Sequence, residues 1–111
     1  MLVVDDYADT RELVRMLLEM KGCSVFEAAN GREAVDLTWR VAFSFILMDL
    51  EMPVLDGFEA SREIRARPET SVVPVIAFSA NCSGERRALA LAAGCTECIA
   101  KPIGLPLIEE W

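Results

Sequence analysis

The sequence predicts an α/β fold in which five short parallel strands alternate with helices around one open sheet. Five short apolar runs alternate with amphipathic segments along the chain. No two of these runs are joined by a connection of hairpin length, so the strands must pair in parallel through right-handed crossovers. The chain has 111 residues, a length that suits one domain with a single core.

The N-terminal part is expected to form a strand, a helix and a second strand. Residues 2–5 are apolar up to an aspartate, and residues 24–28 read as a short strand. Between them, Asp9 is expected to cap a helix, Glu12 to reach back to the cap, and Gly22 to end the helix. The apolar residues of this helix recur at spacings of four: Leu13, Val14, Leu17 and Leu18.

The middle of the chain repeats this order. Asn30-Gly31 predicts a turn, after which we expect a helix over residues 32–40 and a strand over residues 43–49. The strand is apolar throughout, which is typical of a strand covered on both faces. A loop that contains Pro53 then leads to an amphipathic helix over residues 58–65.

The C-terminal part adds two strands. Residues 72–78 are rich in β-branched residues, with Pro74 near the start, where a strand tolerates proline. Residues 85–93 form an alanine-rich helix closed by Gly94. Residues 98–100 are a brief strand, and residues 105–111 make at most two helical turns.

The composition argues against several classes of partner. The formal net charge is −7, so a nucleic-acid backbone would be repelled, and no local basic patch offsets that charge. The longest uncharged stretch, residues 70–84, contains polar residues and a proline and is too short to span a bilayer. The N-terminus has no basic segment followed by an apolar core, so we expect a cytoplasmic protein without membrane insertion.

The four cysteines are expected to be reduced, because a chain that is 53% apolar folds without a disulfide framework. Cys95 and Cys98 form a C-x-x-C pair, which is compatible with a redox site or half a zinc site. The other two are Cys23 and Cys82, and the chain has no histidine to complete a set of four ligands. We therefore favour small buried hydrophobic residues as the interpretation.

Four of the apolar runs end on residues suited to phosphate chemistry. Asp5 and Asp6 follow the first run, Asp49 ends the third, Ser79 the fourth and Lys101 the fifth. Ligands of parallel α/β sheets bind beyond the carboxyl ends of the strands, so these five side chains are expected to converge. Clustered carboxylates repel one another unless they share a cation, and Mg²⁺ is the hard ion that prefers such oxygen ligands.

Four segments, in this order and spacing, resemble the receiver domain of two-component response regulators. They are Leu2-Val3-Val4-Asp5-Asp6, Ile46 to Pro53 followed by Asp56-Gly57, Pro74 to Ala80, and Lys101-Pro102. The resemblance covers the whole chain, residues 1–111, as a single domain. It implies a flavodoxin-like doubly wound sheet of five parallel strands in the order 2-1-3-4-5, with helices on both faces.

The resemblance also implies a chemistry. Asp49 would be the nucleophile that takes a phosphoryl group from a partner, giving an acyl phosphate that can be discharged again. Asp6, Asp49 and the backbone carbonyl of Glu51 would hold Mg²⁺, and Asp5 would bind it through water. The chain would then be a phosphoacceptor switch that catalyses only its own phosphorylation and dephosphorylation, and not an enzyme with a separate substrate.

The remaining roles follow the same resemblance. Lys101 would pair with a phosphoryl oxygen, the Ser79 hydroxyl would move in to donate to another, and Pro102 would be the family's cis-proline. Cys98 stands where the family commonly carries a Tyr or Phe that swings inward, which argues against an aromatic-coupled switch here. Glu51 and Asn81 occupy positions that modulate the lifetime of the phosphoryl group in relatives.

The implied partners are a histidine kinase or histidine phosphotransfer protein, since the chain has no histidine of its own, and a downstream effector or fused output domain. Phosphorylation adds about −1.5 to −2 charges and would shift the population of two conformations. The face formed by the fourth helix, the fifth strand and the last helix would carry the signal and is a candidate homodimer interface. The early first strand and the short last helix suggest either a minimal protein or a domain excised from a larger one.

Two other classes of protein share parts of this pattern. A flavodoxin-like FMN-binding module needs a Ser/Thr/Gly-rich phosphate loop after the first strand, where Asp5 and Asp6 would repel a phosphate. An aspartyl-phosphate hydrolase of the haloacid dehalogenase type carries Asp-x-Asp on its first strand. Here the two aspartates are contiguous, and the candidate nucleophile lies on the third strand.

Overall fold

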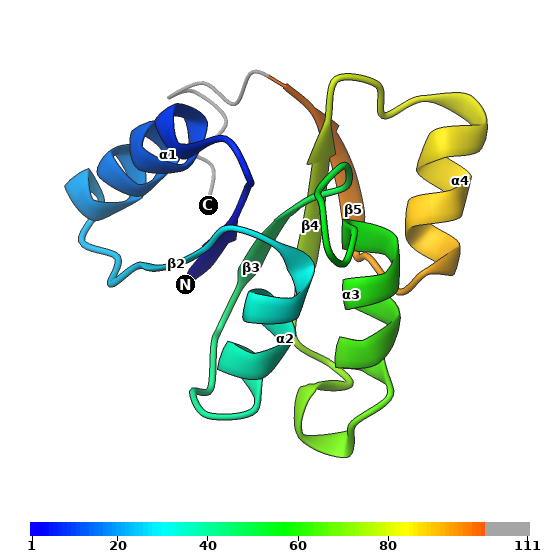
Figure 1. Ribbon diagram of the computed structural model, residues 1–111, viewed down its shortest axis with the longest axis horizontal. Helices are drawn as coiled ribbons and strands as arrows, with labels where there is room; N and C mark the ends of the chain where they lie inside the picture. The colour runs from blue at the N-terminus through cyan, green and yellow to red at the C-terminus, as the bar shows by residue number, and fades with distance from the viewer. Residues whose placement is uncertain (102–111) are drawn as a thin grey trace.

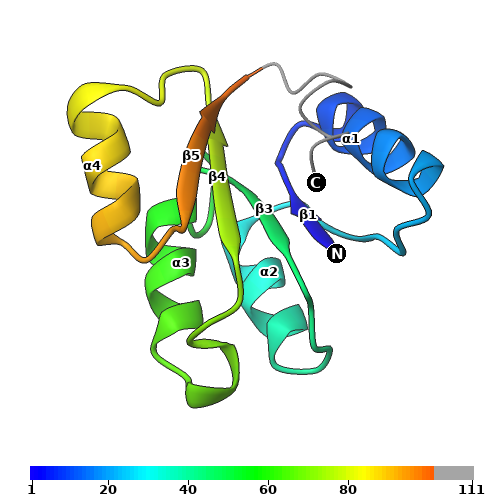
Figure 2. The same cartoon turned by 180° about the vertical axis from the view of Figure 1, so that it is seen from behind.

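The fold is a doubly wound α/β sheet, described for residues 1–101 in a computed structural model (Figure 1). Its elements in chain order are β1 (Leu2–Val4), α1 (Ala8–Met20), β2 (Phe26–Ala28), α2 (Gly31–Thr38), β3 (Ile46–Asp49), α3 (Gly57–Arg65), the 3₁₀ turn η1 (Pro68–Thr70), β4 (Val75–Ser79), α4 (Gly84–Ala92) and β5 (Glu97–Ala100). All neighbouring strands pair in parallel, in the order β2-β1-β3-β4-β5. Figure 2 shows β1, β3, β4 and β5 in this order. The predicted strand order is therefore confirmed, while the helix expected over residues 105–111 lies outside the described residues.

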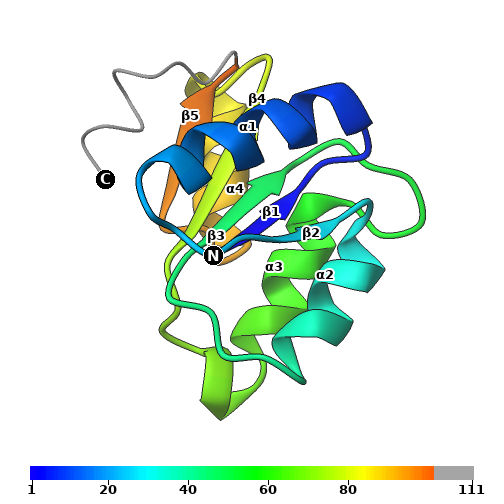
Figure 3. The same cartoon turned by 90° about the vertical axis from the view of Figure 1, so that its left-hand side faces the viewer.

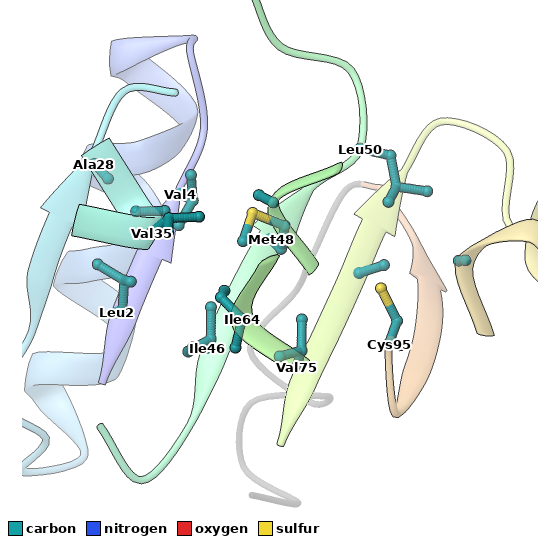
Figure 4. Close-up of a cluster of buried hydrophobic side chains, with 14 of the residues drawn as sticks. Leu2, Val4, Ala28, Val35, Ile46, Met48, Leu50, Ile64, Val75 and Cys95 are labelled. Carbon is teal, nitrogen blue, oxygen red and sulfur yellow. The ribbon is translucent and has the colours of Figure 1, made fainter. Parts of the chain in front are cut away.

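Helices cover both faces of the sheet, as predicted. Helices α2, α3 and α4 lie on one face and α1 lies on the other (Figures 1 and 3). Alternate strand residues divide between two core clusters: Leu2, Val4 and Met48 face α2 to α4, whereas Val3 and Leu47 face α1. Figure 4 shows the larger cluster, in which Val35 of α2 and Ile64 of α3 pack against the strands.

Side-chain caps set the start of two helices that flank the site. The Asn30 carboxamide oxygen accepts a hydrogen bond from the Glu33 amide at 2.9 Å, which starts α2. The Asp56 carboxylate accepts one from the Glu59 amide at 2.9 Å, which starts α3. The prediction that Asp9 caps α1 is wrong. The helix begins at Ala8, so Asp9 lies within its first turn.

The connection between β3 and α3 is tightly packed against the end of β3. The Gly57 amide donates a hydrogen bond to the Leu50 carbonyl at 3.0 Å. A Cβ at position 57 would lie 2.2 Å from the Asp49 carbonyl oxygen, so only glycine fits there. Within the same connection, Val54 has a φ of 69°, a left-handed conformation that is strained for a β-branched residue.

The cysteines depart from the sequence prediction. Cys82 and Cys98 form a disulfide, so the prediction that all four thiols are reduced is wrong for this pair. The physical reason is that the loop after β4 passes over β5 and brings the two Cα atoms to 5.6 Å, within the range that a disulfide spans. Cys23 and Cys95 are free, and Cys95 is buried as predicted.

No helix within residues 1–101 combines the length and the apolar character that a bilayer crossing requires.

Candidate functional site

Two aspartates lie side by side at the carboxyl edge of the sheet. Asp5 follows β1 and Asp49 ends β3, and these strands pair in a register that sets Val4 beside Met48. Asp5 is fully buried and Asp49 is 2% exposed, whereas the neighbouring Asp6 is exposed. Carboxylate oxygens of the three aspartates lie within 4.8 Å of one another. The predicted acidic cluster therefore forms.

Main-chain and side-chain contacts hold Asp5 in place. Its Oδ1 accepts a hydrogen bond from the Tyr7 amide at 2.9 Å, and its own amide donates to the Ala28 carbonyl at 3.1 Å. Arg11 of α1 donates to the Asp5 carbonyl at 2.8 Å and also pairs with Glu27 at 3.0 Å. These contacts fix the end of β1 relative to α1 and β2.

Lys101 brings its ammonium group to both buried carboxylates. The Lys101 Nζ lies 3.2 Å from Asp5 Oδ2 and 3.4 Å from Asp49 Oδ2. The chain follows β5 to this point, where the Lys101 amide donates to the Ser79 carbonyl at 2.8 Å. The Lys101 stem lies across Phe78, with Nζ 4.9 Å from the ring centroid. The lysine predicted at the end of the fifth strand thus faces the acidic cluster.

Burial and charge give Asp49 an unusual proton affinity. Loss of solvation and, after it, the neighbouring Asp5 carboxylate raise the pKa of Asp49 to about 7, against the opposing effect of Lys101. A carboxyl group with this pKa is partly protonated near neutral pH, and a bound cation would favour its charged form. The site therefore couples the proton of Asp49 to metal binding.

Ser79, at the end of β4, is buried and is held by a side chain of the β3–α3 connection. Its hydroxyl donates to the two carboxylate oxygens of Glu51, at 3.1 and 3.2 Å, and accepts from the Asn81 amide at 3.4 Å. Arg86 of α4 forms an ion pair with the same Glu51 carboxylate. In this conformation the hydroxyl is thus engaged away from Asp49.

The main chain of Glu51 adjoins the nucleophile candidate, because its amide donates to Asp49 Oδ1 at 3.3 Å. Sequence reasoning gave Glu51 a backbone role at the metal and a position that modulates the phosphoryl lifetime in relatives, but it missed the contact of the Glu51 carboxylate with Ser79, as well as Arg86. Arg86 and Glu51 lie far apart in the sequence, and no sequence pattern marks the pairing of the half-buried Arg86 with the exposed Glu51. Pro102, predicted to aim the lysine, lies outside the described residues.

The residues present fit a magnesium ion. The cluster offers carboxylate oxygens, which are the hard ligands that Mg²⁺ prefers, and it combines two buried carboxylates with an exposed third. Asp5 Oδ2 is buried and accepts no hydrogen bond from any residue within 1–101, although the Lys101 ammonium lies 3.2 Å away. An oxygen with unused acceptor capacity at this position suits a metal or a metal-bound water.

Comparisons with known proteins agree with this site. A family model described as the response regulator receiver domain matches residues 1–110. The transcriptional regulatory protein ResD of Bacillus subtilis is 40% identical over 101 residues, which make up 91% of this chain and 41% of ResD. This chain thus spans less than half of that relative.

Solved structures add detail about the site in relatives. The receiver domain of the sensor histidine kinase PA1611 from Pseudomonas aeruginosa has a TM-score of 0.91 and 36% identity, over 98% of this chain and 89% of that one. Its structure has a magnesium ion coordinated in the active-site cleft. The receiver domain of Ssk1 from Saccharomyces cerevisiae, crystallised with the histidine phosphotransfer protein Ypd1, matches with a TM-score of 0.89 and 29% identity, over 98% and 82% of the two chains.

Proposed function

Because this chain belongs to the response regulator receiver domain family, we propose that Asp49 is the residue on which it accepts a phosphoryl group. The domain is a signalling phosphoacceptor and not a conventional enzyme. The contact that carries the proposal is the approach of Lys101 Nζ to within 3.4 Å of the buried Asp49 carboxylate, beside Asp5.

The transfer balances as a displacement at phosphorus. A carboxylate oxygen of Asp49 attacks the phosphorus of a phosphohistidine on the partner, the P–N bond breaks, and the imidazole leaves. The product is an acyl phosphate, which water later hydrolyses to inorganic phosphate and the free carboxylate. Lys101, which follows β5, stabilises the charge on the phosphoryl oxygens.

Asp5, Asp6, Asp49 and the backbone carbonyl of Glu51 are the groups that would hold Mg²⁺. When bound, Mg²⁺ supplies positive charge that offsets the carboxylates and the incoming phosphoryl oxygens. Asp5 would act through a bound water, since Oδ1 accepts from the Tyr7 amide and Oδ2, beside the Lys101 ammonium, keeps acceptor capacity for a water molecule.

The switch follows from the position of Ser79. Its hydroxyl must leave the Glu51 carboxylate in order to donate to the phosphoryl group, and this exchange moves the loop that leads into α4. The partner preference of the α4 and β5 surface then changes through a shift in population. We also propose that two copies of the chain dimerise through this face, which would include the helix predicted at the C-terminus.

The proposed partners are a histidine kinase or a histidine phosphotransfer protein as donor, and an effector or a fused output domain as receiver of the signal. The Ssk1 receiver domain, which crystallised with such a phosphotransfer protein, supports the first part. We also propose a cytoplasmic location for the chain. The acidic character of the edge after β1 disfavours an FMN phosphate, and the contiguous Asp5 and Asp6 disfavour the hydrolase alternative.

A labelling experiment tests the acceptor. The chain is incubated with a small acyl-phosphate donor, with and without Mg²⁺, and the hydroxylamine-labile phosphoryl adduct is measured. Asp49→Asn is expected to abolish the adduct, because the amide is not a nucleophile. The exposed Asp9→Asn is the matched control and is expected to retain it. Equal labelling of both variants would remove Asp49 as the acceptor.

A further inference from the structure

The Cys82–Cys98 disulfide joins the two segments that carry Ser79 and Lys101 into the pocket. Cys82 lies three residues after Ser79, and Cys98 lies three residues before Lys101. The Lys101 amide also donates to the Ser79 carbonyl at 2.8 Å. The disulfide and this hydrogen bond therefore close a ring around the ends of β4 and β5, next to the phosphoacceptor site.

We propose that Cys82 and Cys98 are a redox-sensitive pair whose disulfide restrains the loop after β4 and thereby slows phosphoryl acceptance, a consequence that rests on the proposed function of Asp49. In the reduced state the loop is free to follow Ser79 from Glu51 toward the phosphoryl group. In the oxidised state Cys82 is fixed to β5, with the two Cα atoms 5.6 Å apart.

The surroundings of the two sulfurs assign them different roles. Cys82 is half-buried in the loop directly before Ser83, the N-cap residue of α4, where the positive end of the helix dipole attracts a thiolate. Cys98 is 4% exposed and lies within the core beneath α4. Cys82 is thus the thiol that an oxidant reaches first, and Cys98 is the thiol that resolves the intermediate.

The chemistry balances with hydrogen peroxide as the oxidant. The Cys82 thiolate attacks one peroxide oxygen, the O–O bond breaks, and a sulfenic acid and hydroxide form. The Cys98 sulfur then attacks the Cys82 sulfur, the S–O bond breaks, and water leaves. Two thiols and one peroxide give one disulfide and two waters, and a dithiol reductant reverses the change by thiol–disulfide exchange.

The other two cysteines are separate from this pair. Cys95 is buried, its sulfur lies 3.3 Å from the Ser61 hydroxyl, and burial raises the pKa of its thiol, all of which keep it unreactive. Cys23 packs against the core cluster on the α1 side of the sheet. Cys95 and Cys98, despite their C-x-x-C spacing, are therefore not the reactive pair.

The location matters because the loop must move for signalling. Ser79 donates to Glu51, which also pairs with Arg86 at the start of α4, so the hydroxyl, the loop and α4 form one connected unit. A covalent link from Cys82 to β5 holds this unit in the arrangement in which Ser79 faces Glu51. Disulfides in reducing compartments are labile, which suits a reversible restraint.

Thiol mapping tests the pair independently of phosphorylation. The full chain is treated with hydrogen peroxide or a dithiol reductant, free thiols are alkylated, and linked peptides are identified by mass spectrometry. With the alkylation carried out in denaturant, so that buried thiols also react, we expect a reductant-sensitive Cys82–Cys98 link with Cys23 and Cys95 alkylated in both states. Hydrogen exchange of the backbone in residues 80–83 should be slower in the oxidised chain. A link between Cys95 and Cys98, or unchanged exchange, overturns the proposal.

The rate of labelling by a small acyl-phosphate donor tests the consequence. Oxidation is expected to slow the initial rate by about threefold or more, and the reductant should restore it. Cys82→Ser should show one rate under both conditions, whereas the Cys23→Ser/Cys95→Ser double variant should respond like the wild type. Equal rates in the two redox states of the wild type overturn the restraint. If neither state is labelled at Asp49, the proposed function fails, and the mapping and exchange data still decide the redox pair.

Discussion

The carboxyl group of Asp49 is the group at which we propose that proton, metal and phosphoryl chemistry meet. Burial and the neighbouring Asp5 raise its pKa to about 7 from the ordinary 3.8. The folded chain without metal therefore holds a proton that the unfolded chain has lost, and its stability falls as the pH rises from 3.8 toward about 7.

Mg²⁺ should reverse this dependence, because it binds the deprotonated form. The increase in Tm on adding Mg²⁺ is predicted to be larger at about pH 8 than at about pH 6. The reason is that protons compete less with Mg²⁺ for the Asp49 carboxylate once the pH exceeds the pKa of Asp49. Calorimetry or thermal denaturation followed by circular dichroism measures both shifts. Asp49→Asn, which lacks the titrating group, should lose most of the difference. A shift of equal size at both pH values in the wild type would contradict this account of Asp49.

In the proposed switch, Glu51 competes with the phosphoryl group for the Ser79 hydroxyl. Glu51→Gln removes a negative charge near the acceptor and weakens the contacts with Ser79 and Arg86, while it leaves the backbone carbonyl in place. The initial rate of labelling by a small donor is expected to rise about two- to fivefold, as expected for a partly exposed ion pair.

The control for Glu51 is Glu69→Gln, a change of the same charge at an exposed position in η1, at the opposite end of the sheet. It should leave the labelling rate unchanged. A slower rate in Glu51→Gln would mean that this carboxylate assists the transfer and does not restrain Ser79.

Val54 stores strain beside the site. Its φ of 69° is unfavourable for a β-branched residue and its side chain is 80% exposed, so little packing offsets the cost. Val54→Asn is expected to raise the free energy of unfolding by about 1 kcal/mol, because asparagine tolerates this conformation. Chemical denaturation measures the change. Val72→Asn, which is equally exposed but outside the left-handed region, should be nearly neutral, and a loss of stability in Val54→Asn would refute the strain.

Individual site residues were predictable where strand ends mark them. Asp5, Asp49, Ser79 and Lys101 each end or follow an apolar run, and the sheet brings all four to one edge. Contacts made by long side chains from loops were not predictable, because no periodicity encodes the meeting of Arg86 with the β3–α3 connection.

At the scale of elements, the close approach of α3 to β3 positions the acceptor. Gly57→Ala would place a Cβ 2.2 Å from the Asp49 carbonyl oxygen, which forces the helix or the strand end to shift. We expect a loss of about 1–3 kcal/mol in the free energy of unfolding, together with slower labelling of Asp49.

Denaturant titration and the labelling rate, measured on the same preparation, check this prediction. Gly22→Ala is a control for a glycine whose Cβ would meet nothing within 4 Å, although its φ of 87° adds backbone strain. It should lower stability without slowing the labelling of the folded protein. Normal stability in Gly57→Ala would show that the β3–α3 connection adjusts freely.

The sequence predicted which segments are helices and which are strands, but it did not predict the residues at which these elements begin and end. The first four strands were predicted longer than they are, as with residues 43–49 against Ile46–Asp49, because apolar loop residues such as Phe43 pack on the core without joining the ladder. In contrast, β5 was predicted one residue too short. Asp56 is the N-cap residue of α3, at the junction where the sequence predicted that a loop passes into a helix. Tyr7 precedes α1 without a side-chain cap hydrogen bond, so the sequence rule for caps misplaced that start.

At the scale of the whole molecule, the alternation of strands and helices predicted a parallel sheet, and the rule for strand ends predicted where its ligand site lies. The strand order came from the family resemblance, since periodicity alone permits several orders. The disulfide depends on how one loop lies over β5, a geometry that cysteine spacing does not encode.

The most direct measurement is chemical trapping of the phosphorylated residue. The chain is phosphorylated by a small acyl-phosphate donor with Mg²⁺ and reduced with borohydride, which converts an aspartyl phosphate to homoserine, and its peptides are sequenced by mass spectrometry. The account predicts homoserine at position 49, dependent on Mg²⁺ and strongly diminished in Lys101→Ala. Homoserine at another aspartate, or none at position 49 under conditions that label the chain, would contradict it.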